Sequence, residues 1–226
     1  MNNAEIAMEI KQRNITRLCH FVHTNLLLHI LNSEEGIKAV NFINKDVLEQ
    51  NDQQRLDGKK DFVNCSVQYP NYWYLKRVLD NNPVFPDWAV IFIDPIIITY
   101  ETTEFCSVNA ATRYGAYIER GYDAFNDMFA NRIEKGNFPQ IRKPNMLNHA
   151  PTDDQAEVLV YKNIPRKLIT GIAFMNEEIA REKKAAWKVL GFPNYDIFIA
   201  PELFTRAASD KIRQGILPQE YKYVEE

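Results

Sequence analysis

Cysteine is scarce in this sequence, with Cys19, Cys65 and Cys106 the only three among 226 residues. Three scattered cysteines are too few for a disulfide framework or a zinc cluster. Each lies in an apolar segment, where a free cysteine behaves as a small hydrophobic residue. We therefore expect a reducing compartment and no bound metal.

Long apolar runs are also missing. No stretch approaches the roughly 20 apolar residues that a membrane-spanning helix needs. Residues 1–14 are polar and charged and do not contain the apolar centre of a signal peptide. The sequence thus predicts a cytoplasmic protein without a membrane partner.

The sequence has no glycine-rich phosphate-binding loop and no dinucleotide-binding fingerprint, which excludes a Rossmann dehydrogenase at the level of motifs. It also has no excess of positive charge, because its net charge is −3. Binding of nucleic acid by bulk electrostatics is therefore excluded, and any contact would need a local basic groove. Taken singly, each candidate for such a groove is equally well explained as a solvated surface charge: Lys59, Lys60, Lys76, Arg77, Arg113, Arg142 and Lys143.

The composition, with 46% hydrophobic and 25% charged residues, is that of an ordinary globular protein. The length indicates a single domain over residues 1–226 with a substantial core. Hydrophobic periodicity and the positions of Gly, Pro and Asn predict the elements. Strands are expected over 17–22, 62–67, 88–93, 156–160, 169–174 and 195–199, and helices over 3–13, 24–32, 44–50, 71–79, 109–133 (two, broken at Gly121) and 176–190, followed by a short helical tail.

Strands and helices that mix without strict alternation predict the α+β class. Residues 96–100 fit either a further strand or a helical turn. Residues 134–155 show no periodicity and contain three prolines, and a loop of this length in a compact domain is usually functional or disordered.

One charged residue interrupts an apolar strand. Glu157 lies in the run 156–160, directly after the polar stretch 152–155. Two interpretations stay open from the residues alone. The carboxylate either faces solvent on the wet side of its strand, which is the commoner case, or lies in a cleft and takes part in chemistry.

A second strand-like run, residues 17–23, carries His20 and His23 and leads into a helix. A zinc site built from these two histidines is disfavoured, because residues i and i+3 of a strand point to opposite faces. For His23 and His29 we favour packing or surface roles. Asn64 and Ser66 alternate with apolar residues of the strand 62–67, so they share one polar face.

Four segments, found in matching order between about residues 14 and 200, resemble the DarT toxins: 20–31, the region of Arg55, 63–71 and 155–160. DarT toxins are DNA ADP-ribosyltransferases that are usually encoded beside an antitoxin which removes the modification. The resemblance implies the ADP-ribosyltransferase fold, with two small antiparallel sheets packed face to face, flanking helices, and NAD in the cleft between the sheets.

The resemblance also assigns the catalytic residues. Glu157 matches the catalytic glutamate of the family, and Arg55 lies where the family carries an arginine needed for catalysis. ADP-ribosyl transfer passes through an oxocarbenium-like transition state, which a carboxylate stabilises. A guanidinium suits the NAD pyrophosphate or a substrate phosphate.

Five residues are expected to bind NAD on the same basis. His20 matches the histidine of the first strand, but Val22 stands where the family usually has threonine in a His-x-Thr-His pattern. Asn25 is a nearby polar group that would compensate for the missing hydroxyl. Asn64 would meet the cofactor from its strand, and Tyr69 would either stack on nicotinamide or pack in the core.

In transferases of the class that the chain resembles, the loop before the catalytic strand chooses the acceptor, so the resemblance implies this role for the loop 134–155. Single-stranded nucleic acid needs cations for its phosphates and aromatic faces for its bases. The candidate substrate-binding residues are Asn109, Arg142, Lys143 and His149, with Tyr114, Tyr117 and Tyr122 as aromatic faces. Helix capping is an alternative explanation for Asn109.

The resemblance thus implies an NAD-dependent toxin that modifies a base of single-stranded DNA, with an ADP-ribosyl-removing, DarG-like antitoxin as partner. Because Val22 departs from the pattern associated with thymine, guanine is weakly preferred. Two alternatives remain. One is the same transfer to RNA or protein, and the other is a nucleic-acid-binding module without enzymatic activity.

Overall fold

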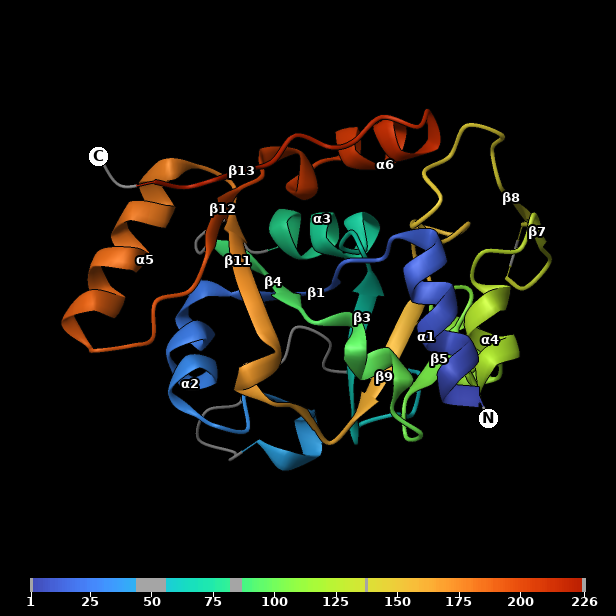
Figure 1. The fold of residues 1–226 in the computed structure, drawn as a ribbon, viewed down its shortest axis with the longest axis horizontal. Helices are drawn as coiled ribbons and strands as arrows, with labels where there is room; N and C mark the ends of the chain where they lie inside the picture. Colours follow the sequence, from blue (N-terminus) through green and yellow to red (C-terminus); the bar gives the residue numbers. More distant parts are fainter. Residues whose placement is uncertain (1, 44–55, 82–86, 137, 225–226) are drawn as a thin grey trace.

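The computed structural model describes residues 2–43, 56–81, 87–136 and 138–224 (Figure 1). Over these residues the fold is organised by a nine-stranded sheet with the strand order β13-β12-β11-β4-β1-β3-β9-β5-β6. Its strands are β1 (Leu18–His23), β3 (Phe62–Val67), β4 (Trp88–Ile93), β5 (Glu104–Cys106), β6 (Glu119–Arg120), β9 (Glu157–Tyr161), β11 (Ile169–Phe174), β12 (Ile197–Ile199) and β13 (Tyr221–Lys222).

The predicted pair of separate sheets is replaced by this one continuous sheet, and the sheet is mixed because β11 and β12 are parallel. The sheet can nevertheless be divided into two halves, which meet between β1 and β3. β1 pairs with β4 along its whole length, whereas it pairs with β3 at Leu18↔Val67 and Cys19↔Ser66. The two halves are therefore joined by a short ladder, beyond which β1 and β3 separate.

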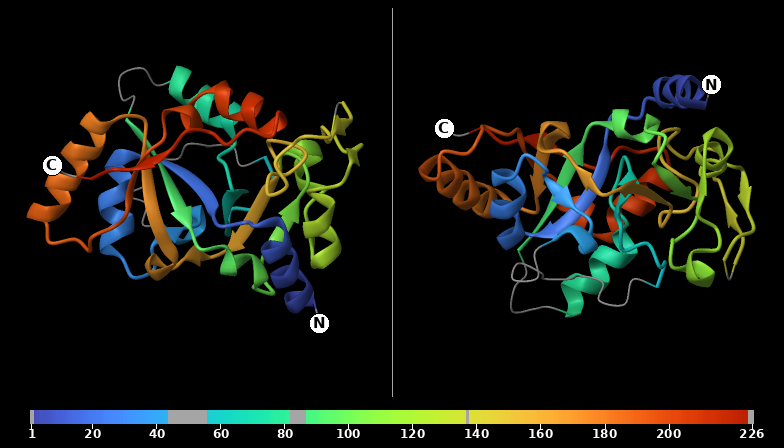
Figure 2. Two further views of the ribbon diagram at one scale, coloured as in Figure 1. Left: turned by 45° about the horizontal axis from the view of Figure 1, so that its top comes forward. Right: turned by 90° about the horizontal axis from the view of Figure 1, so that it is seen from below.

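Helices cover both faces of the sheet. They are α1 (Asn2–Arg13), α2 (Leu27–Asn32), α3 (Tyr72–Asn81), α4 (Tyr122–Asp127), α5 (Glu177–Val189) and α6 (Arg206–Arg213). The main core packs one sheet face against α1, α2, α4 and α5, and a second core packs the other face against α3 and α6. Figures 1 and 2 show α2 and α5 at one end of the molecule and α4 at the other.

Short elements complete the described structure. Two small ladders pair β2 (Ile37–Lys38) with β10 (Asn163–Ile164) and β7 (Arg132–Ile133) with β8 (Gln140–Ile141). The 3₁₀ helices are η1 (Thr24–Leu26), η2 (Val40–Phe42), η4 (Pro95–Thr99), η5 (Thr112–Gly115), η6 (Arg166–Leu168) and η7 (Pro201–Phe204). η4 occupies the segment for which a strand or a helical turn was expected.

Most predicted elements are confirmed, but the segment 109–133 is not two helices. Only α4 is α-helical there, and residues 109–121 form turns, η5 and β6. Arg113 and Tyr114 adopt left-handed backbone conformations with φ of 48° and 58°, which an α-helix does not accommodate. The predicted loop 134–155 also contains β8, which pairs with β7. The helix expected over 44–50 lies outside the described residues.

Candidate active site

Glu157 is the first residue of β9, which lies between β3 and β5 in the sheet. Val158 and Val160 pack into the main core, and Leu159 packs into a separate small cluster. Since side chains alternate along a strand, Glu157 shares the face of Leu159. Glu157 is only 8% exposed, so its side chain does not face solvent.

Two neutral donors hold the Glu157 carboxylate. The Asn64 side-chain amide donates from Nδ2 to Oε2 at 2.6 Å, and the backbone N–H of Ala110 donates to Oε1 at 3.0 Å. Asn64 reaches Glu157 because it pairs with Leu159 across the β3–β9 ladder and so lies diagonally opposite on the same face. Both carboxylate oxygens are thereby fixed in orientation.

The same Asn64 amide also holds a second buried carboxylate. Its Nδ2 donates to Asp57 Oδ2 at 3.1 Å, while the backbone N–H of Lys59 donates to Asp57 Oδ1 at 2.9 Å. An ionised carboxylate only accepts hydrogen bonds, so the orientation of the amide, with its NH₂ toward both acids, follows from the chemistry. Asn64 therefore bridges Asp57 and Glu157.

The segment after β5 shapes this cluster through its backbone. Asn109 Oδ1 accepts from the N–H of Ala111 at 3.0 Å, a local turn that leaves the neighbouring Ala110 N–H directed at Glu157. Gly115, with φ of +85°, lies so close to the Asp57 turn that a Cβ would sit 2.6 Å from the carbonyl oxygen of Asp57. Asn109 begins a turn here, not the helix that was expected.

Glu104 is a further buried carboxylate on this side of β5. Lys59 Nζ lies 2.6 Å from one of its oxygens and Arg120 Nη2 lies 2.7 Å from the other. These ion pairs connect β5 to β6 and to the turn that carries Asp57. Glu104 thus holds β5, β6 and the Asp57 turn together around the Asp57–Asn64–Glu157 cluster.

His20 lies where β1 and β3 separate. Its Nδ1 is 2.8 Å from the backbone oxygen of Asn64, and because a carbonyl only accepts, Nδ1 carries the proton in this hydrogen bond. The imidazole therefore joins β1 to β3, the strand whose Asn64 side chain binds Glu157. Val22 is buried in the main core, and Asn25 lies in η1 with an exposed side chain.

Tyr69 and His149 form a pair that joins the segment after β3 to the loop before β9. Tyr69 is buried in the second core, and its hydroxyl lies 2.9 Å from His149 Nε2. Burial lowers the pKa of His149, and Arg17 and Arg142 lower it further. Burial raises the pKa of Tyr69 well above its ordinary value. Tyr69 is therefore placed as a core aromatic, the second of its two expected roles.

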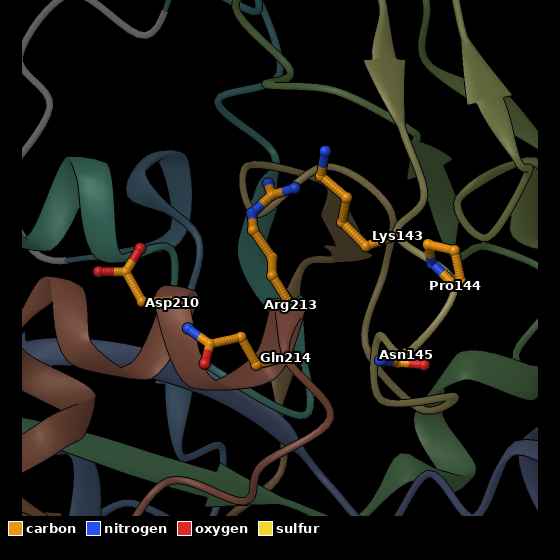
Figure 3. Close-up of a pocket in the computed structure, with 6 residues that line it drawn as sticks. All are labelled: Lys143, Pro144, Asn145, Asp210, Arg213 and Gln214. Atoms are coloured by element: carbon orange, nitrogen blue, oxygen red, sulfur yellow. The ribbon is translucent and has the colours of Figure 1, made fainter.

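Arg142 fastens the loop in which it lies. Its guanidinium donates to the backbone oxygens of Ala150 at 2.8 Å and Leu147 at 2.9 Å, and burial lowers its pKa. Lys143, the next residue, is exposed and lines a surface depression together with α6 (Figure 3).

Glu157, Asn64 and Asn109 thus converge on one cluster, which His20 adjoins. Arg55 lies outside the described residues. Sequence reasoning missed Asp57, which belongs to a polar turn, and the Ala110 N–H, which carries no signal in the sequence. Over the described ranges, no group of three His, Cys, Asp or Glu side chains is arranged to hold a metal ion, and no helix is long and apolar enough to span a membrane.

Comparisons with known proteins identify the family and the fold. The family model described as "ssDNA thymidine ADP-ribosyltransferase, DarT" matches residues 19–205. No curated protein sequence matches the chain.

Solved DarT structures share the fold. A Thermus sp. 2.9 DarT in complex with NAD+ superposes with a TM-score of 0.60 at 15% identity, covering 84% of this chain and 98% of that one. The same protein in complex with ADP-ribosylated ssDNA gives 0.59 at 15% identity, over 85% and 97% of the two chains. Thermosipho africanus DarTG in complex with ADP-ribose gives 0.55 at 15% identity over 84% of this chain, which spans 51% of the DarTG chain.

At this identity the structures establish the fold, and the family model establishes the relationship. With the match extending from β1 to η7 and including the strand of Glu157, this chain belongs to the DarT family of single-stranded-DNA ADP-ribosyltransferases.

Proposed function

We propose that this chain transfers ADP-ribose from NAD to a base of single-stranded DNA, with Glu157 as the catalytic carboxylate. The observation that carries the proposal is the buried Glu157 side chain, whose two oxygens are held by the Asn64 amide and the Ala110 N–H. A carboxylate fixed in this way stabilises positive charge without reorganising during the reaction.

The reaction needs such a group. The bond between nicotinamide and the anomeric carbon of the ribose breaks, and a new bond forms between that carbon and a nitrogen of the base. The ribose carries oxocarbenium-like charge between these events, as in glycoside hydrolysis. Glu157 stabilises that charge and accepts the proton that the base nitrogen loses.

The residues around Glu157 fit the polar part of NAD. A carboxylate accepts hydrogen bonds from ribose hydroxyls, and so does Nε2 of an imidazole whose Nδ1 carries the proton. His20 adjoins the cluster through the Asn64 carbonyl, to which its Nδ1 donates. Both N–H groups of the Asn64 amide are directed at Glu157 and Asp57. We therefore assign Asn64 the positioning of Glu157 in place of the direct NAD contact first expected. Arg55 keeps its proposed role at a phosphate.

Thymine is the favoured base. The description of the matching family model names thymidine, whereas the expectation of guanine depended on the hydroxyl that Val22 lacks. Val22 is 3% exposed and packs in the main core, which removes that reason. A DarG-like antitoxin that removes the modification is the proposed partner, and Glu157→Ala should relieve the toxicity of the chain expressed without it.

The test uses labelled NAD and four acceptors: single-stranded DNA, duplex DNA, RNA and protein. We expect label on single-stranded DNA with the wild type and none with Glu157→Gln, and mass spectrometry of an oligonucleotide that contains each base once should find the adduct on thymidine. Label on RNA or protein alone would change the acceptor. Tight oligonucleotide binding, without NAD binding and unaffected by Glu157→Gln, would replace the enzyme with a binding module.

A further inference from the structure

A surface depression of about 530 Å³ lies between the loop that precedes β9 and the C-terminal end of α6 (Figure 3). Its lining comes from these two segments and, apart from one proline, consists of residues with polar or charged side chains. The lining residues are Lys143, Pro144, Asn145, Asp210, Arg213 and Gln214. The depression is thus built for a hydrophilic ligand.

The two walls are docked firmly against each other. The N–H of Leu147 donates to the carbonyl oxygen of Ile212 at 3.1 Å. Gly215, with φ of +79°, approaches so closely that a Cβ would lie 2.4 Å from the carbonyl oxygen of Asn145. Met146 packs in the same apolar cluster as Ile212. The lining residues are therefore presented by a preformed surface.

Two cations, Lys143 and Arg213, and one acid, Asp210, line the depression. Figure 3 shows the side chains of Lys143 and Arg213 extending toward the same open region. Lys143 has no ion-pair partner among the residues that the structure describes, and the Arg213 guanidinium lies 3.1 Å from Asp154. The one acid of the lining, Asp210, is 3.6 Å from Arg206 on the same helix.

The lining groups match a phosphodiester. Lysine, arginine and amide side chains all donate hydrogen bonds, and phosphate oxygens accept them. The C-terminal end of a helix repels anions through its carbonyl groups. Here those of Lys211 and Ile212 already accept N–H groups from residues 147 and 214–216, which weakens that repulsion.

The depression is tied to the catalytic strand. Arg213 binds Asp154, which lies three residues before Glu157. A chain of three residues spans at most about 10 Å, so the backbone at Asp154 lies within that distance of the backbone at Glu157. This proximity is the reason for placing a nucleotide next to the modified one at this surface. Residues 206–214 lie beyond the span 19–205 that the family model matches.

We propose that this depression binds a backbone phosphate of the single-stranded DNA substrate next to the modified nucleotide. The inference rests on the proposed function and adds Lys143 and Arg213 as phosphate-binding residues. It also assigns Asp210 a negative contribution, because its carboxylate faces the same ligand.

The test is the equilibrium binding of a fluorescent oligonucleotide, measured by anisotropy without NAD over a series of salt concentrations. Each phosphate contact on a single strand contributes about 0.7 to the slope of log K against log salt, or about a fivefold change between 0.1 M and 1 M salt. Lys143→Ala should lower the slope by that amount and weaken binding about fivefold at 0.1 M salt. Asp210→Asn should tighten binding.

Lys222→Ala is the matched control, because Lys222 is an exposed lysine of β13 whose ion-pair partner is Asp196 and which is not among the lining residues. It should leave the slope unchanged. An unchanged slope for Lys143→Ala, or weaker binding for Asp210→Asn, would overturn the subsite. If Lys143→Ala raises the KM for NAD and leaves the KM for the oligonucleotide unchanged, the depression binds the NAD pyrophosphate and not the DNA. That result would also overturn the proposed DNA subsite. Because this binding is measured without turnover, absence of transfer by the wild type would refute the proposed function alone.

Discussion

Asn64→Asp reverses the electrostatics of the candidate site with almost no change in shape. The wild-type amide donates to Glu157 at 2.6 Å and to Asp57 at 3.1 Å. The variant places a third carboxylate between these two acids. We expect Glu157 to leave its present orientation, and transfer to fall on the order of 100-fold, the loss that a misplacement of about 1 Å causes.

The effect on stability follows from the same contacts. Two unit charges 4 Å apart repel by about 4 kcal/mol at an effective dielectric constant of about 20, and a hydrogen bond to a charged group contributes about 1.5–3 kcal/mol. Protonation of one carboxyl relieves part of this cost. We therefore expect a loss of about 3 kcal/mol, and a Tm lower by about 10 °C for a chain of this length.

The assay is single-turnover transfer of labelled ADP-ribose at 25 °C, with circular dichroism to establish that the variant is folded. Activity of Asn64→Asp relative to wild type should rise as the pH falls, because the carboxyl that the substitution introduces donates a hydrogen bond again once it is protonated. The control is Asn41→Asp, since Asn41 donates to Asp61 at 2.8 Å in an exposed pair outside the site. Transfer by folded Asn64→Asp within tenfold of wild type would refute the positioning role.

Three further predictions concern the loop before β9. The pKa of His149 is lowered in the folded state, so its contribution to stability is present above pH ~6.5 and is lost as the pH falls through the folded-state pKa. In urea unfolding, His149→Gln should therefore lose less stability than the wild type between pH 7.5 and pH 5.5. An equal loss in the two proteins would contradict this prediction. Burial raises the pKa of Asp153, so the contribution of this side chain to folding stability is present below pH ~3.9 and is lost as the pH rises through the folded-state pKa. Asp153→Asn should therefore raise the Tm at pH 7 but not at pH 3. A lower Tm of the variant at pH 7 would count against this prediction. Arg142→Ala removes the hydrogen bonds to the carbonyls of Ala150 and Leu147, so the rate of backbone amide hydrogen exchange should rise across residues 143–150. An unchanged rate would show that apolar contacts are enough to hold this loop in place without Arg142.

Buried strands could be predicted from the sequence almost to the residue. Residues 88–93 and 169–174 are uninterrupted or nearly uninterrupted apolar runs, and they form β4 and β11 with those bounds. The register between strands and the merging of two expected sheets into one depend on a ladder of two residue pairs between β1 and β3. Hydrophobic periodicity describes each strand by itself and carries no information on that ladder.

The segment 109–133 shows how local composition misleads. Its apolar residues recur as in a helix, but two of its glycines, Gly115 and Gly121, have positive φ. The non-glycine residues Arg113 and Tyr114 also have positive φ. The chain turns there because the segment packs against the Asp57 turn. That is a tertiary contact between residues far apart in the sequence, which overrides intrinsic helix propensity.

The candidate site was predictable only in part. Glu157 and Asn64 stand out because each interrupts an apolar strand, and strand alternation then places them on polar faces. Asp57 does not stand out in its polar turn, and the backbone N–H of Ala110 is indistinguishable from any other. Both are identified by their hydrogen bonds, which only the folded chain brings together.

The most direct test of the account is transfer of labelled ADP-ribose from NAD to a single-stranded oligonucleotide by Glu157→Gln, beside the wild type and Glu104→Gln. Glu157→Gln keeps the shape of the side chain and removes the charge, so we predict NAD binding without transfer. Glu104→Gln removes a buried carboxylate that binds Lys59 and Arg120, and it should lower stability and weaken transfer without abolishing it. Transfer by Glu157→Gln at the wild-type rate would contradict the central claim.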